Sequence, residues 1–194
     1  MLIFTIFAVI IDYSANLAFI RDTLKGRSRP NLVTYGLWGT APLIGFGIQI
    51  SEGVGFSSIY TLAIALGPLS VFFTGLLVKH KWKLGTFDLL CGLCSIISLV
   101  LWLVLDLEML AFLFSILSDL FAYLPTIRKL YIEPESETTA SYVLAFIASI
   151  FAILAALSNP SIFTLLFPIE VFASSMIGLV LIYRKKIFRQ LRVK

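Results

Sequence analysis

Three acidic residues lie inside long apolar stretches of this sequence, where a charged side chain is costly. Asp12 and Asp119 each occupy the middle of such a stretch, and Glu170 lies in a third. An ionised Asp at the centre of a bilayer costs about 2.5–3.5 kcal/mol, so two would cost roughly 5–7 kcal/mol, comparable with the net stability of a domain. Acids in such positions normally face a cavity, find a partner or stay protonated. We therefore take all three as candidate proton-coupling residues, and the two aspartates also as candidate substrate-binding residues.

Polar side chains accompany both aspartates at helical spacing. Asn16 lies one turn after Asp12, and Ser115 and Tyr123 lie one turn on either side of Asp119, so these groups share the faces of the aspartates. Such faces favour a hydrated, substrate-binding cavity across which Asp12 and Asp119 face each other. The alternative is structural, with each aspartate protonated and hydrogen-bonded between helices.

Three further side chains each have two interpretations. Glu170, with Ser174 one turn later, is either a second proton site or outer-gate partner, or an interfacial, hydrated group. Tyr35 and Trp38 either stack on a flat solute in the substrate site or serve as packing and interface anchors.

Prolines in the apolar stretches are candidate hinges. Each removes a backbone donor and can kink its helix, although proline is also ordinary in membrane helices. The four are Pro42, Pro68, Pro125 and Pro168.

The composition of the whole chain is that of a membrane protein. Of its 194 residues, 59% are hydrophobic and 13% are charged, and the mean hydropathy is +1.00. A membrane-spanning helix needs about 20 mostly apolar residues. We predict an all-α integral membrane protein in the lipid bilayer, with seven transmembrane helices at residues 2–20, 32–50, 59–78, 89–105, 109–127, 141–157 and 161–183. The first lacks the features of a signal peptide, so we expect it in the mature protein.

The basic residues predict the orientation. All 15 Lys and Arg residues lie in four regions on one side of the predicted spans, at residues 21–29, 79–83, 128–129 and 184–194. Basic loops favour the cytoplasm, which places the N-terminus outside and the C-terminus inside, in a multi-pass protein that we expect in the plasma (inner) membrane. The net charge of +4 is then a topology signal rather than a nucleic-acid-binding surface.

The sequence also repeats itself. At an offset of 107 residues, identical residues coincide in Phe7/Phe114, Asp12/Asp119, Ala15/Ala122, Arg21/Arg128, Tyr35/Tyr142 and Ala41/Ala148. Chance is the alternative, but matched Asp, Arg and Tyr residues without a gap disfavour it. We therefore predict two parallel three-helix repeats, 1–83 and 109–194, the second with a basic cytoplasmic tail, joined by a linker helix in 84–108.

This layout of three, one and three helices resembles the PQ-loop and SWEET (MtN3-like) transporter superfamily. So does the segment LPTIRKLYIEPESETTAS at residues 124–141, where Pro125 near the cytoplasmic end of a helix precedes a polar loop. The resemblance implies a transporter of a small solute such as a sugar, amino acid or vitamin, in some members linked to protons. The superfamily also includes cargo receptors that share this layout.

We therefore expect a small-solute transporter with alternating access at a midplane site between two helix bundles. The alternative is a membrane receptor or assembly subunit that binds a ligand or partner without moving it. An oligomer is compatible with both.

Enzymatic chemistry is disfavoured. Cys91 and Cys94 form a C-x-x-C pair but His80 is the only histidine of the chain, too few ligands for zinc. We expect no metal, no cofactor and no catalytic residue, the surviving alternative being an intramembrane hydrolase or transferase that uses the two aspartates.

Two loops on the basic side differ in charge. Residues 21–30 are basic and residues 133–137 are acidic. The repeat would bring them to one inner opening, where they either close a gate together or are solvated separately.

The orientation can be tested by labelling. In a variant without the two native cysteines, cysteines introduced at Glu52 and Glu108 should react with an impermeant maleimide from outside. Cysteines at Lys81 and Lys194 should react only from inside. Outside labelling at Lys81 would contradict both the orientation and the parallel repeat.

Overall fold

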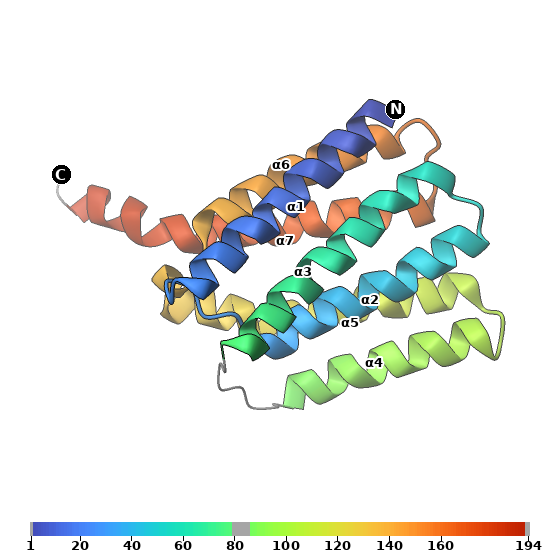
Figure 1. Ribbon diagram of the computed structural model, residues 1–194, viewed down its shortest axis with the longest axis horizontal. Coiled ribbons are helices and arrows are strands. Elements are labelled where there is room, and N and C mark those ends of the chain that lie inside the picture. The colour runs from blue at the N-terminus through green and yellow to red at the C-terminus, as the bar shows by residue number, and fades with distance from the viewer. Residues whose placement is uncertain (1, 79–85, 193–194) are drawn as a thin grey trace.

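The computed structural model describes residues 2–78 and 86–192, and the regular secondary structure of this part of the chain is entirely helical (Figure 1). Short 3-10 turns at Gly55–Ser57 and Pro134–Ser136 lie in two of the connections. The seven described α-helices are α1 (Leu2–Leu24), α2 (Leu32–Ser51), α3 (Ser58–Leu77), α4 (Thr86–Leu103), α5 (Glu108–Ile132), α6 (Thr139–Ala156) and α7 (Ile162–Arg192).

Each predicted span corresponds to one of these helices, which confirms the all-α class. Helices α1, α5 and α7 run further than their apolar stretches, because a helix can continue into polar residues once it leaves the hydrocarbon. The predicted boundary between residues 83 and 84 lies outside the described residues.

Five of the described segments are long and apolar enough to cross a membrane, namely Leu2–Leu24, Gly55–Leu77, Glu108–Ile132, Thr139–Ala156 and Ile162–Arg184. Helix α2 is not among them, since its glycines, Pro42, Trp38 and Gln49 lower its hydropathy. Helix α4 is short and borders residues that are not described.

Six helices form a closed ring. Helix α1 packs against α3 and α6, α2 packs against α3 and α5, and α7 packs against α5 and α6. Helix α4 lies outside this ring, along α5 and in contact with α2 (Figure 1). The ring thus encloses a central space to which α1, α2, α3, α5, α6 and α7 can all contribute side chains.

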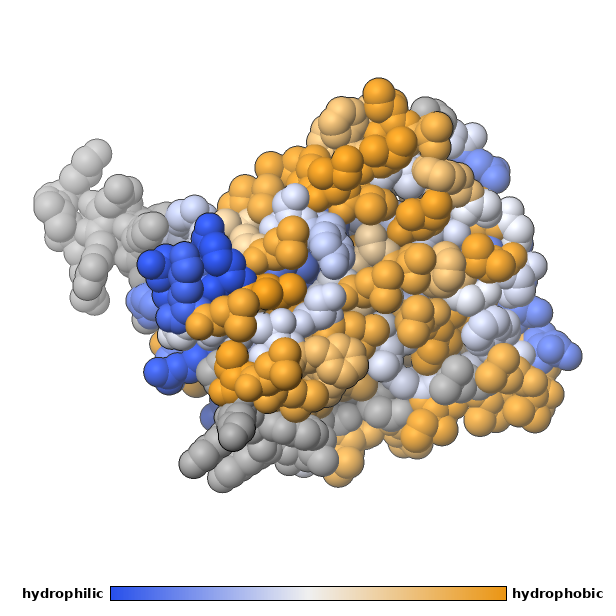
Figure 2. Space-filling model, in the orientation of Figure 1, coloured by the Kyte–Doolittle hydropathy of each residue, from blue (hydrophilic) through white to orange (hydrophobic). Residues whose placement is uncertain are grey.

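The outer surface is apolar and polar groups turn inward. On α1, Leu2, Ile6 and Ile10 are 56%, 42% and 57% exposed, whereas Asp12 and Asn16 are buried. Figure 2 shows hydrophobic residues across the middle of the visible face and hydrophilic residues at both ends. This pattern is the one expected where lipid, not water, surrounds the bundle.

One half of the ring is filled by apolar side chains. Phe112 and Phe167 pack with Ile48 and Phe163 near the α2–α3 and α6–α7 connections. Gly45 allows α2 to approach α7 there, because a Cβ at this position would lie 2.3 Å from the Phe167 ring. The larger cavity therefore lies in the other half.

Candidate functional site

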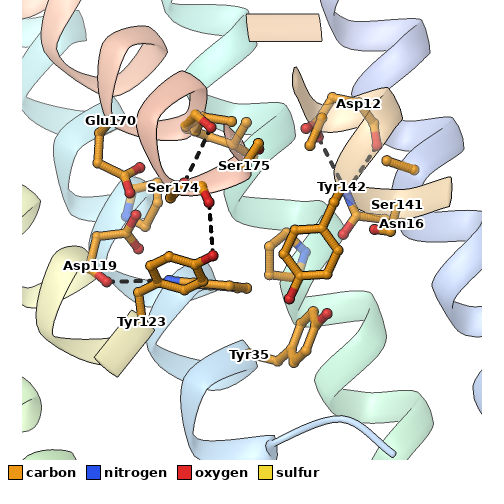
Figure 3. A pocket seen from close by; sticks show the side chains of 17 residues that line it. Asp12, Asn16, Tyr35, Asp119, Tyr123, Ser141, Tyr142, Glu170, Ser174 and Ser175 are labelled. Carbon is orange, nitrogen blue, oxygen red and sulfur yellow. Dashed lines mark hydrogen bonds between the residues drawn. The ribbon is translucent and has the colours of Figure 1, made fainter. Parts of the chain in front are cut away.

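A cavity of about 90 Å³ lies inside the ring and is lined by side chains from all six of its helices. One water molecule needs roughly 10–15 Å³ on this scale, so the cavity holds several water-sized groups. Its polar and aromatic lining residues (Figure 3) are Asp12, Asn16, Tyr35, Trp38, Asp119, Tyr123, Ser141, Tyr142, Glu170, Ser174 and Ser175.

On one side of the cavity, Asp12 has an amide partner. The Asn16 amide donates to the Asp12 carboxyl group (Nδ2 to Oδ2, 3.2 Å) and to the Asp12 carbonyl (3.0 Å). Gly67 of α3 makes room for that amide, because a Cβ at Gly67 would lie 2.3 Å from Asn16 Nδ2. Helix α3 therefore holds Asn16 against Asp12.

On the opposite side, Asp119 has an acidic neighbour (Figure 3). The carboxyl groups of Asp119 and Glu170 lie within hydrogen-bonding reach of each other, and both residues are buried. Two carboxyl groups can share a hydrogen bond only if one carries a proton. Within the described residues, Asp119 Oδ1 has no hydrogen-bond partner.

Two aromatic rings are fixed beside this acid pair. The Trp38 indole donates to the Asp119 carbonyl (Nε1 to O, 3.2 Å), and the Tyr123 hydroxyl donates to the Ser174 carbonyl (2.8 Å). The centroids of the two rings are 5.5 Å apart. These bonds hold an aromatic wall next to Asp119 and Glu170.

Tyr35 and Tyr142 bound the cavity towards the α1–α2 and α5–α6 loops. The Tyr35 ring packs against Trp38 at a centroid distance of 5.4 Å, and the Tyr142 hydroxyl makes a long hydrogen bond to Glu137 Oε2 (3.5 Å). Gly178 of α7 makes room for the Tyr142 ring, because a Cβ at Gly178 would stand 2.4 Å from Tyr142 Cδ1. The tyrosines thus connect the cavity to the loops.

The two loops contact each other. The Ser28 and Thr138 hydroxyls are 2.5 Å apart, Thr138 also donates to Asp22 (3.3 Å), and the Arg29 amide donates to the Ser136 carbonyl (3.1 Å). The predicted meeting of these loops is confirmed, and the alternative of separately solvated loops is wrong. These contacts use hydroxyl groups, backbone groups and the Asp22 carboxylate.

Next to this contact lies an ion pair in which Glu137 is buried and Lys129 is partly buried. Lys129 Nζ is 2.5 Å from Glu137 Oε1 and also donates to the Arg29 carbonyl. Burial raises the pKa of the Glu137 carboxyl above its ordinary value, while the Lys129 charge and hydrogen bonds from Lys129 and Tyr142 oppose that rise. Lys129 therefore links α5 to both loops.

Most residues predicted from the sequence line the cavity: Asp12, Asn16, Tyr35, Trp38, Asp119, Tyr123 and Glu170. Ser115 does not. It is fully buried, and its hydroxyl donates to the Phe112 carbonyl (2.7 Å) of its own helix, in the apolar half of the ring. Its predicted role in binding substrate therefore has no support from its position.

Asp12 and Asp119 line the cavity from opposite sides (Figure 3). The acid next to Asp119 is Glu170, a pairing that the sequence did not predict. The interfacial, hydrated alternative for Glu170 is wrong, because this side chain is only 7% exposed. The reason is the packing of α7 against α5, which brings Glu170 to Asp119.

Sequence reasoning did not assign Ser141, Tyr142 or Ser175 to the site. Tyr142 had a signal, since it matches Tyr35 in the repeat. Ser141 and Ser175 had no such signal in the sequence.

The four prolines predicted as hinges differ in their position relative to the cavity. Helices α2, α3, α5 and α7 continue through their prolines. Pro42 and Pro68 line the cavity, whereas Pro125 and Pro168 do not. Hinge motion at these residues stays a prediction.

Metal-binding groups are not seen in the described part of the chain, where no three His, Cys, Asp or Glu side chains cluster to hold an ion. Cys94 is buried, and His80 lies outside the described residues.

Comparisons of the chain with protein-family models, with curated proteins and with solved structures give no match. Inferences about function therefore depend on the residues and contacts of the chain itself.

The contact between Gly67 and Asn16 yields a stability prediction. Gly67→Ala should displace Asn16 from Asp12, because the new Cβ would stand 2.6 Å from Asn16 Cγ. Overpacking of this kind costs about 1–3 kcal/mol, which lowers the melting temperature by roughly 2–12 °C. Thermal unfolding of the purified protein in detergent measures this.

A matched control is Gly36→Ala in α2, whose Cβ would meet the Phe72 ring at an ordinary 3.4 Å. It should leave the melting temperature unchanged or slightly higher, since alanine favours helix. Equal melting temperatures for the two variants would show that α3 does not hold Asn16 in place.

Proposed function

We propose that this chain is a small-solute membrane transporter with alternating access, whose central site is the cavity between two three-helix bundles. The observation that carries the proposal is a cavity large enough for several water-sized groups, surrounded by six helices and lined by the three acids Asp12, Asp119 and Glu170. Acids inside a membrane mark solute, ion or proton paths more often than they stabilise a fold.

The packing of the helices supports two parallel repeats. If α1, α2 and α3 correspond to α5, α6 and α7, every contact in the ring has a counterpart. Contacts α1–α3 and α2–α3 match α5–α7 and α6–α7, and α1–α6 matches α5–α2. Helix α4, outside the ring, then has the place of a linker, as in the PQ-loop and SWEET superfamily that the sequence resembles.

Side chains support the same correspondence. Asp12 and Asp119, and Tyr35 and Tyr142, are pairs at the repeat offset, and all four line the cavity. Rocking of one bundle against the other about this cavity would expose it to each side in turn.

The loop contact fits a gate on the basic, cytoplasmic side. In the conformation described, Ser28 meets Thr138 and Lys129 meets Glu137, while the Phe112 and Phe167 cluster fills the opposite half. Alternating access requires each closure to open in turn. Binding without translocation, as in a receptor, would require neither.

Substitution of the aspartates tests the site. Asp12→Asn and Asp119→Asn keep the side-chain shape and remove the charge. In proteoliposomes, counterflow of a radiolabelled panel of amines, amino acids, sugars and nucleosides should identify a transported solute for the unaltered chain. Each variant should then transport it at least tenfold more slowly or without its pH dependence, at normal expression.

The exposed Glu52 provides the control, because Glu52→Gln removes a charge far from the cavity and should transport normally. Unchanged rate and pH profile in both aspartate variants would make these acids structural. Binding of a solute without counterflow would favour a receptor instead.

A crosslink tests the gate. Cysteines at Ser28 and Thr138, whose hydroxyl oxygens are 2.5 Å apart, should form a disulfide on mild oxidation in a background without native cysteines. The crosslink should abolish counterflow, because it holds the loops closed, and reduction should restore it. Each single-cysteine variant should be insensitive to oxidation. Full transport by the crosslinked protein would exclude opening at these loops.

A further inference from the structure

The charges around the cavity select the kind of ligand. Asp12, Asp119 and Glu170 line it, and none of its described lining residues is Lys, Arg or His. Lys129 is engaged outside the cavity by Glu137 and the Arg29 carbonyl. An anion, or the carboxylate of a zwitterion, therefore finds no counter-charge here, whereas a cation finds three carboxyl groups.

The two sides of the cavity are not equally available. Asp12 already accepts the Asn16 amide. Asp119 Oδ1 is buried without a partner in the described part of the chain, and its carboxyl group lies beside that of Glu170. When both acids are ionised they repel each other, and either a proton or a bound cation relieves the repulsion.

The wall beside this pair is aromatic. Trp38 and Tyr123 are each held by a hydrogen bond to backbone, to Asp119 and to Ser174 respectively, so their rings keep a fixed position. The Tyr35 and Tyr142 rings complete the lining on the loop side (Figure 3). Carboxylates together with aromatic faces are the groups that bind organic ammonium ions.

We propose that the cavity binds a small organic cation, with its ammonium group between Asp119 and Glu170 and against the rings of Trp38 and Tyr123. This rests on the proposed function insofar as the cavity is the solute site, and it names the class of solute. Binding of the cation displaces the proton that the acid pair holds, so the net charge of the site is unchanged.

Two matched sets of probes test the class. Choline is compared with its neutral isostere 3,3-dimethylbutan-1-ol and with the zwitterion glycine betaine. Phenethylamine is compared with 2-phenylethanol and with phenylalanine. In each set the shapes are similar and the main difference is the charge.

The readout is the fluorescence of Trp38 in a full-length Trp82→Phe/Trp102→Phe variant, in which it is the remaining tryptophan of the three in the chain. Isothermal titration of the unaltered protein gives the same ranking if this variant does not fold. In at least one set, the cation should bind tenfold or more tightly than both its neutral and zwitterionic analogues, and should release a proton into weakly buffered solution.

Substitutions then locate the ammonium group. Asp119→Asn and Glu170→Gln should each weaken binding of the cation tenfold or more, with Glu52→Gln as the unchanged control. The proposal is overturned if neither set prefers the cation, or if both acid variants bind it normally.

Transport is scored separately from binding. Cation binding without counterflow would sink the transport function and keep the ligand class. Counterflow of a neutral or anionic solute, with no preference for the cation, would support the transport function and contradict the proposed ligand class.

Discussion

A carboxyl group surrounded by hydrocarbon must be neutralised or partnered, and this requirement organises the rest of the structure. The helices that carry Asp12, Asp119 and Glu170 turn those faces towards one another, and their apolar faces point outward. Because backbone groups are satisfied within each helix, the side chains are free to serve the cavity. The ring of six helices is one way of surrounding three acids completely.

The two halves satisfy the requirement by different chemistry. If the two sets of three helices are repeats, Asn16 corresponds to Tyr123 at the offset of 107 residues. Gly67 corresponds to Glu170 at an offset of 103, because the first set has four more residues between its two positions than the second. On the Asp12 side, the small glycine admits an amide, which hydrogen-bonds the acid. On the Asp119 side, a second acid and a phenol take those places. The proposed repeats would thus differ in the side chains that they bring to the cavity.

The fold could be predicted from the sequence to a large extent because it depends on patterns that act locally. Apolar stretches of sufficient length set the helices, and the matched Asp and Tyr residues pointed to most of the cavity lining. The predicted seven spans compare with five segments that are apolar enough by composition. Glycines, aromatics and a glutamine lower the hydropathy of α2, and α4 is short and borders residues that are not described.

The partners inside the cavity could not be predicted in the same way. Ser115 shares a helical face with Asp119, yet it lies a turn deeper, where Phe112 and its neighbours fill the ring. Glu170 finds Asp119 because α7 packs against α5. Spacing along one helix fixes which residues share a face, but the depth and rotation of the neighbouring helix decide what that face meets.

Because α4 lies on one side only, the two sides of the bundle are covered differently. This helix lies along α5 and reaches α2, so it covers the seam between α2 and α5. On the other side the seam between α1 and α6 is closed by Phe4, Phe7 and Phe151, with Phe7 exposed at the surface of the bundle. In a bilayer, acyl chains would therefore touch the α1–α6 seam directly and be kept from the α2–α5 seam by α4. Any separation of the halves would be felt first by the lipids beside α1 and α6, and the thickness and lateral pressure of the bilayer would act on the protein from that side.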